Sequence, residues 1–113
     1  MLPHKITSAY IEYTFYINLY TAYMQYKDEK VLHFNKILGK VVKQLRMEKG
    51  ISANKFANEF DLSSGNYSRI ENGVFCIKFI TIWKIIEAHN LSFSEFAQKL
   101  KDELGEDFTL IDI

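Results

Sequence analysis

The chain has 113 residues, with 14 basic and 14 acidic side chains and a formal net charge of zero. This length predicts a single domain, and a hydrophobic fraction of 48% with 15% aromatic residues excludes gross disorder, which goes with few aromatics and high net charge. The single cysteine, Cys76, excludes an internal disulfide framework and favours a reducing, cytoplasmic location.

The zero net charge conceals an uneven distribution along the chain. Residues 34–78 carry eight basic and four acidic side chains, whereas residues 79–113 carry three basic and seven acidic ones. A basic segment beside an acidic one favours a surface for a polyanion on the middle of the chain only. Charges that cluster by chance on solvated helix faces would give the same count, so the distribution by itself leaves both interpretations open.

Residues 1–33 form an aromatic-rich extension that we expect to be helical. Six tyrosines within residues 10–26 recur at spacings of three and four, which places them on one helical stripe. Glu12, Asn18 and the tyrosine hydroxyls interrupt the stretch, so it predicts neither a membrane span nor a secretory signal. The segment could be a helix packed on the main domain, an arm that pairs two protomers, or a dispensable leader if translation starts at Met24.

Residues 34–105 predict an all-α domain. Apolar residues from Phe34 to Leu45 recur at three and four and indicate a first helix of about four turns, which Gly50 ends. A second helix is capped by Ser52 and directs Phe56, Ala57 and Phe60 inward. The break at residues 61–63 is followed by a third helix, capped by Ser63 or Ser64, with Tyr67 and Ile70 inward and Asn72-Gly73 at its end.

Two further helices and a tail complete the predicted domain. The fourth helix runs from Phe79 to about His89, with Trp83 expected in the core. The fifth begins with a capping box of Ser92 and Glu95, and its core stripe starts at Phe93. Residues 106–113 form a C-terminal tail whose apolar part, residues 108–113, predicts a short strand or a docking peptide.

The most specific motif is residues 52–73, SANKFANEFDLSSGNYSRIENG, which predicts a helix, a tight turn and a second helix. Ala57 supplies the small side chain that two steeply crossing helices need where their axes approach. Residues 36–100 resemble the helix-turn-helix domain of the Cro and phage-repressor type, also called the xenobiotic-response-element regulators, and SRIENG is the most specific part of the match. The resemblance implies a five-helix, lambda-repressor-like DNA-binding domain in which the second helix of the motif, about residues 63–71, enters the major groove.

The resemblance also implies roles for individual residues. Arg46 and Glu71 would form a structural ion pair that ties the first helix to the recognition helix. Arg69 is the one long donor on the recognition face, and a bidentate contact from arginine to guanine is the strongest direct readout of a base. The full set of residues expected to contact DNA is Ser63, Ser64, Gly65, Asn66, Ser68, Arg69, Asn72, Lys55 and Lys78.

Several positions depart from the family pattern. Ala53 stands where the family has a glutamine that donates to a phosphate, Asp61 where the turn has glycine, and Tyr67 where the family has isoleucine or valine. Gly65 lies inside the recognition helix, where it costs roughly 1 kcal/mol, and it removes one side chain that would read a base. These departures predict modest intrinsic specificity, or binding strengthened by dimerisation.

No catalytic arrangement, metal site or cofactor motif stands out, because His4, His33 and His89 lack metal-ligand spacing and no phosphate-binding loop occurs. The leading hypothesis is a non-enzymatic, sequence-specific transcriptional regulator, a repressor or an activator, that binds double-stranded DNA as a homodimer. One alternative is an antitoxin-type regulator that holds a protein partner through residues 10–26 or the C-terminal tail. Another is a protein-interaction module that keeps the fold with weak or no DNA binding.

Overall fold

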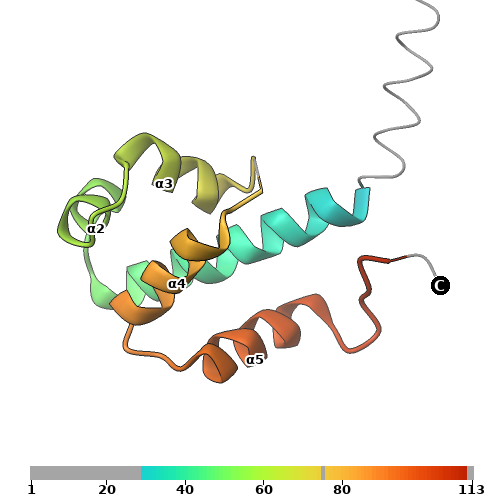
Figure 1. Cartoon of the computed structure of the whole chain (residues 1–113). Coiled ribbons are helices and arrows are strands. Elements are labelled where there is room, and N and C mark those ends of the chain that lie inside the picture. The colour runs from blue at the N-terminus through green and yellow to red at the C-terminus, as the bar shows by residue number, and fades with distance from the viewer. Residues whose placement is uncertain (1–28, 75, 112–113) are drawn as a thin grey trace, which may run out of the picture. The chain divides into compact units, whose positions relative to one another are not determined.

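The computed structural model of the protein describes residues 29–74 and 76–111. A helix over residues 29–49 is followed by α2 (Ala53–Glu59), α3 (Ser64–Asn72), α4 (Phe79–Ala88) and α5 (Phe93–Leu104). No residue in the described ranges lies in a strand, which confirms the predicted all-α fold of five helices (Figure 1). The aromatic stripe of residues 10–26 lies outside the described residues. The first helix includes residues 29–33, so the expected boundary between residues 33 and 34 falls within a helix.

The core lies where helix 29–49 meets α2, α3 and α4. Phe56 of α2 is fully buried, and its ring centroid lies 5.0 Å from those of Tyr67 and His89 and 4.8 Å from that of Phe60. Helix 29–49 runs through the middle of the domain, with α3 on one side and α5 on the other (Figure 1). The buried apolar side chains come from all five helices: Leu38, Val41, Val42, Leu45, Phe56, Ala57, Tyr67, Ile70, Ile85, Ile86, Ala88 and Phe96.

The helix ends follow the capping signals in the sequence. The Ser52 hydroxyl accepts a hydrogen bond from the backbone N–H of Lys55, and Ser63 caps α3 in the same way. Ser92 and Glu95 form the predicted capping box at the start of α5. Each cap satisfies backbone donors that a helix start otherwise leaves without partners, so the starts of α2, α3 and α5 are fixed locally.

Two glycines allow α3 to approach helix 29–49 closely. A β-carbon at Gly39 would lie 2.5 Å from the carbonyl oxygen of Ile70 and 2.6 Å from that of Glu71. At Gly73, which ends α3 with a φ of +67°, a β-carbon would lie 2.7 Å from the Cα of Lys36. Neither site has room for a larger residue, so the end of α3 is held directly against the first helix.

The structure corrects two expectations from the sequence and excludes one of the two alternatives for the described part of the tail. Trp83 is not in the core: it is 48% exposed, and Phe93, expected in the core stripe of α5, is 45% exposed. Apolar residues occur on all sides of α4, so the periodicity did not indicate which side of this helix is buried against the rest of the domain. The tail forms no strand within residues 105–111; instead the Phe108 ring packs 6.3 Å from the Phe34 ring and 5.8 Å from that of His33.

Candidate nucleic-acid interface

The turn between α2 and α3 sets the angle between these two helices. Asp61 has a φ of +56°, the left-handed conformation for which the family pattern has glycine and which aspartate tolerates better than most residues. The Leu62 N–H donates to the Ala57 carbonyl at 2.8 Å, and Leu62 is half-buried against the core. The predicted helix, tight turn and helix are therefore present.

Two buried side chains fix the inner face of α3. Tyr67 is fully buried and Ile70 is 2% exposed. On the opposite face, at helical spacings of i, i+3, i+4 and i+7, lie Gly65, Ser68, Arg69 and Asn72, which are all exposed. On this face, one long cationic side chain, that of Arg69, lies among residues with a short polar side chain or none. The walls of a groove could therefore come close to the backbone of α3.

The remaining predicted positions on this helix lie at its start and flank. Ser63 is exposed, but its hydroxyl is already engaged as the N-cap, accepting from the Asn66 N–H at 3.5 Å. Ser64 is half-buried, and its hydroxyl donates to the Asn58 side-chain oxygen at 3.4 Å. Asn66 is exposed on the flank of the helix beside Ile70. The first turn of α3 contains no acidic residue, so its partial positive charge is not neutralised from within the turn.

Asn58 is a residue of this surface that the sequence argument missed. It lies on α2 three residues after Lys55, a spacing that places both side chains on one helix face, and both are exposed. The three-residue spacing from Lys55 was the signal in the sequence that could have identified Asn58. The contact with Ser64 means that α2 and α3 share a continuous polar edge.

An ion pair holds the far end of α3 against helix 29–49. Arg46 Nε donates to Glu71 Oε2 at 2.7 Å and Nη2 donates to Oε1 at 2.9 Å, a bidentate pair, while Nη1 donates to the Ile51 carbonyl at 2.8 Å. The side chains are 13% and 7% exposed, so the pair is largely shielded from water, unlike exposed surface ion pairs, which add little stability. The hydrogen bond with Glu71 raises the pKa of Arg46. Because its donors are used inside the domain, Arg46 is structural.

Tyr67 lies beside this pair. Its hydroxyl is buried and has no hydrogen-bond partner among the described residues. Burial raises the pKa of Tyr67, and the neighbouring Glu71 carboxylate raises it further. The hydroxyl therefore stays protonated, and the side chain serves to fix α3 rather than to contact a ligand.

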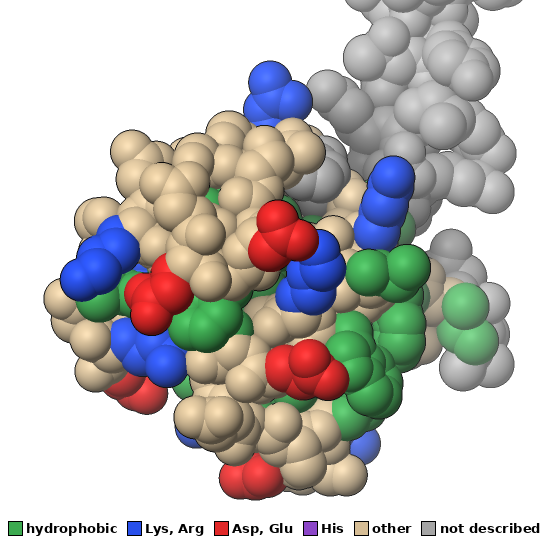
Figure 2. Space-filling view, turned by 60° about the vertical axis from the view of Figure 1, so that its left-hand side comes forward, with side chains coloured by type: hydrophobic (Ala, Val, Ile, Leu, Met, Phe, Trp, Pro, Cys, Tyr) green, Lys and Arg blue, Asp and Glu red, His purple; other side chains and the backbone are tan. Residues whose placement is uncertain are grey.

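The basic side chains surround this surface rather than filling it. Lys55 on α2 and Lys78, the N-cap residue of α4, are both exposed. No described carboxylate lies within ion-pairing distance of Arg69, Lys55 or Lys78. Figure 2 shows the side of the domain that carries α2 turned forward, with cations and a few acids spaced around a largely uncharged polar surface. Such a surface combines neutral hydrogen-bonding groups with peripheral positive charge.

Other kinds of site find little support in the described part of the chain. Among residues 29–74 and 76–111, no group of three or more histidine, cysteine or acidic side chains is placed to hold a metal ion. None of the helices described is long and apolar enough to cross a membrane.

A family model described as a helix-turn-helix matches residues 42–96. This range covers the second part of helix 29–49, all of α2, α3 and α4, and the first turn of α5. No curated protein matches the chain.

Proposed function

The chain belongs, through residues 42–96, to the helix-turn-helix family of the Cro and phage-repressor type, and on that premise we propose that it is a sequence-specific transcriptional regulator. The family makes it a DNA-binding helix-turn-helix protein. In the proposal, α3 enters the major groove of double-stranded DNA, and a homodimer binds two half-sites about one helical turn, roughly 34 Å, apart.

The outer face of α3 is the observation that carries the proposal. Because Tyr67 and Ile70 are buried, the backbone of α3 is held against the domain and its outer face is turned to solvent. Arg69 contacts guanine, and Ser68 and Asn72 contact base edges or the adjacent phosphates. Gly65 lets the duplex approach the backbone of α3.

Phosphate contacts position this face on the duplex. The α3 N-terminus, with Ser63, Ser64 and Asn66 around it, lies where backbone donors and a partial positive charge suit a phosphate. Lys55 and Lys78 supply charge from the neighbouring elements. Substituting either lysine with alanine lowers the slope of log binding constant against log salt concentration by about one. It weakens the binding of all DNA sequences alike.

Selection of bound DNA from a random pool, followed by salt titration of the best sequence, tests the proposal. A regulator recovers a two-fold motif whose binding weakens steeply with salt, because phosphate contacts release counterions. A pool with no shared motif, or no binding at low salt, contradicts the proposal and favours the alternative of a protein-interaction module.

A further inference from the structure

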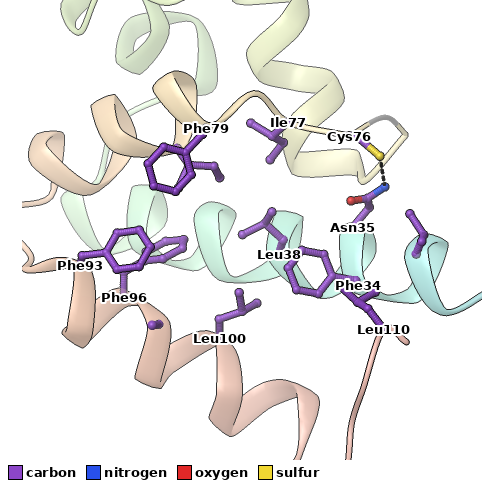
Figure 3. A pocket seen from close by; sticks show the side chains of 13 residues that line it. Phe34, Asn35, Leu38, Cys76, Ile77, Phe79, Phe93, Phe96, Leu100 and Leu110 are labelled. Carbon is purple, nitrogen blue, oxygen red and sulfur yellow. Dashed lines mark hydrogen bonds between the residues drawn. The ribbon is translucent and has the colours of Figure 1, made fainter. Parts of the chain in front are cut away.

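A groove lined by apolar side chains lies between the first helix, the start of α4 and α5, and its volume is about 380 Å³. Figure 3 shows Phe79 and Phe93 at one end of this space and Asn35, Cys76 and Leu110 at the other. None of the described residues that line the groove belongs to α3, so it is separate from the proposed DNA-binding face. Pockets of ~300–1,000 Å³ with an apolar lining and a few polar groups are typical binding sites of small molecules.

Charge and size together determine what can occupy the groove. None of the 13 described side chains that line it is charged, so an ion would lose its hydration there without gaining an ion pair. One turn of an α-helix, ~10–12 Å across and ~5.4 Å long, fills more than the volume of the groove. An apolar cavity of about 150 Å³, by comparison, holds benzene. The groove therefore suits an uncharged small molecule of about two rings, rather than a charged ligand or a helix of a partner protein.

The lining favours an aromatic molecule over an aliphatic one. Four phenylalanines line the groove: Phe34, Phe79, Phe93 and Phe96. The ring centroids of Phe79 and Phe93 lie 5.8 Å apart and their planes are inclined by 43°, a geometry in which aromatic rings attract one another. A planar ligand beside these rings would make contacts of the same kind. Phe79 and Phe93 are 63% and 45% exposed, so such a ligand would also remove apolar surface from water.

Asn35 supplies a polar group at the other end of the groove. Together with Val31, Phe34 and Leu38 it lies at positions i, i+3, i+4 and i+7 of the first helix, and all four side chains line the groove. Asn35 is only 6% exposed, and its Nδ2 donates to Cys76 Sγ at 3.6 Å. Because sulfur is a weak acceptor, this bond offsets little of the cost of burying an amide. A ligand hydroxyl that bonds to the same amide would offset more of that cost.

We infer that the groove binds an uncharged aromatic compound of about two rings that carries one hydroxyl group. The rings lie among the four phenylalanines, and the hydroxyl bonds to the amide of Asn35. The inference goes beyond the proposed function and does not depend on it, because the groove is separate from the exposed face of α3 and binding is measured without DNA. Failure to bind DNA would therefore contradict the proposed function and leave this inference standing.

Two matched probes, 2-naphthol and naphthalene, test the inference, because they share two fused rings and differ by one hydroxyl. Equilibrium dialysis of the full chain against each probe measures the affinity and the number of molecules bound. We expect saturable binding of one molecule per chain, with 2-naphthol bound about three- to tenfold more tightly, as one added hydrogen bond predicts. Binding that does not saturate below the solubility limit of the probes, or equal affinities for the two, overturns the inference.

Matched variants locate the bound probe. Ala97 on α5 lines the groove and is exposed, so Ala97→Phe fills the groove without entering the core and weakens the binding of both probes at least about tenfold. Gln98→Phe adds the same ring at the next residue, which does not line the groove, and leaves both affinities unchanged.

Asn35→Leu tests the polar end of the groove. It removes the preference for 2-naphthol over naphthalene and leaves the affinity for naphthalene as in the wild type. If this variant unfolds, Ala97→Phe and its control still decide the location, because both changes lie at exposed positions of α5. Equal binding of the probes by the wild type and Ala97→Phe places them elsewhere on the surface and overturns the inference.

Discussion

The length of each side chain on the outer face of α3 sets what that face can recognise. Ser68 and Asn72 are short, and Gly65 has no side chain, so only Arg69 reaches deeply into a groove from this helix. A face of this kind gains affinity from close approach of the backbone and discrimination from a single guanidinium. We therefore expect modest specificity from one copy and, on an operator, the binding of two copies.

Gly65→Ala separates the stability of α3 from its function. A β-carbon at Gly65 meets nothing within 4 Å, so alanine fits without a clash and stabilises the fold by about 0.5–1 kcal/mol through its helix propensity. The same methyl group projects from the proposed DNA-binding face and weakens DNA binding a few-fold. Urea unfolding and DNA titration measure the two effects, with Ser94→Ala on α5 as the control. Equal or tighter DNA binding by the Gly65 variant contradicts close approach of the duplex at this position.

The placement of the elements depends on specific contacts as well as on hydrophobic burial. The capping box of Ser92 and Glu95 and the cap at Ser52 could both be predicted, because each is set by residues near one another in sequence. The docking of α3 on helix 29–49 depends on a pair separated by 25 residues, Arg46 and Glu71, which only the family resemblance pointed to.

Breaking the Arg46–Glu71 pair should destabilise the whole domain. Arg46→Ala leaves the Glu71 carboxylate with little access to water and without its partner, and it lowers the free energy of unfolding by about 3 kcal/mol. Arg46→Lys is also destabilising, because lysine cannot make the bidentate contact. Denaturant unfolding measures both.

The Lys40–Glu103 pair provides the matched control for this experiment. Its nitrogen–oxygen distance is 2.9 Å, but its side chains are 53% and 35% exposed, so Lys40→Ala should cost less than about 1 kcal/mol. If Arg46→Ala and Lys40→Ala lowered the free energy of unfolding equally, the burial of the Arg46–Glu71 pair would contribute nothing to the stability.

Over the whole molecule, the sequence was a good guide to which residues form helices. It was a poorer guide to which apolar faces of those helices are buried. Trp83 and Phe93 have the spacing of core residues, yet both are half-exposed, because burial depends on neighbours that local periodicity does not specify. In α4 apolar residues occur on all sides, so no side is distinguished as the inner one. The same ambiguity concealed the exposure of these two rings, which is evident only from the structure.

The stability of the domain should fall as the pH decreases from about 6.5, the unperturbed value for histidine. Burial lowers the pKa of His89 to about 4, and the nearby Lys49 lowers it further. The unfolded chain therefore takes up a proton that the folded state resists, so this contribution is fully present above about pH 6.5 and is lost towards pH 4. We expect a loss of about 1 kcal/mol between about pH 7 and 5, discounted for the partial exposure of the ring.

His89→Phe tests this origin of the pH dependence. Phenylalanine keeps a ring stacked on Phe56, whose centroid lies 5.0 Å from that of His89, but it cannot take up a proton. Unfolding by urea at a series of pH values should show a smaller slope for the variant than for the wild type between about pH 7 and 5. Identical slopes would assign the pH dependence to other groups.

The central claim, that α3 reads bases through Arg69, is tested most directly by the affinity of Arg69 variants for the selected operator and for single-base-pair substitutions of it. Arg69→Ala and Arg69→Lys should each lose about 1–3 kcal/mol of discrimination at one base pair, because neither keeps the bidentate fork. Lys101→Ala on α5 should bind as the wild type does. Wild-type affinity and wild-type base preference in both Arg69 variants would contradict the account.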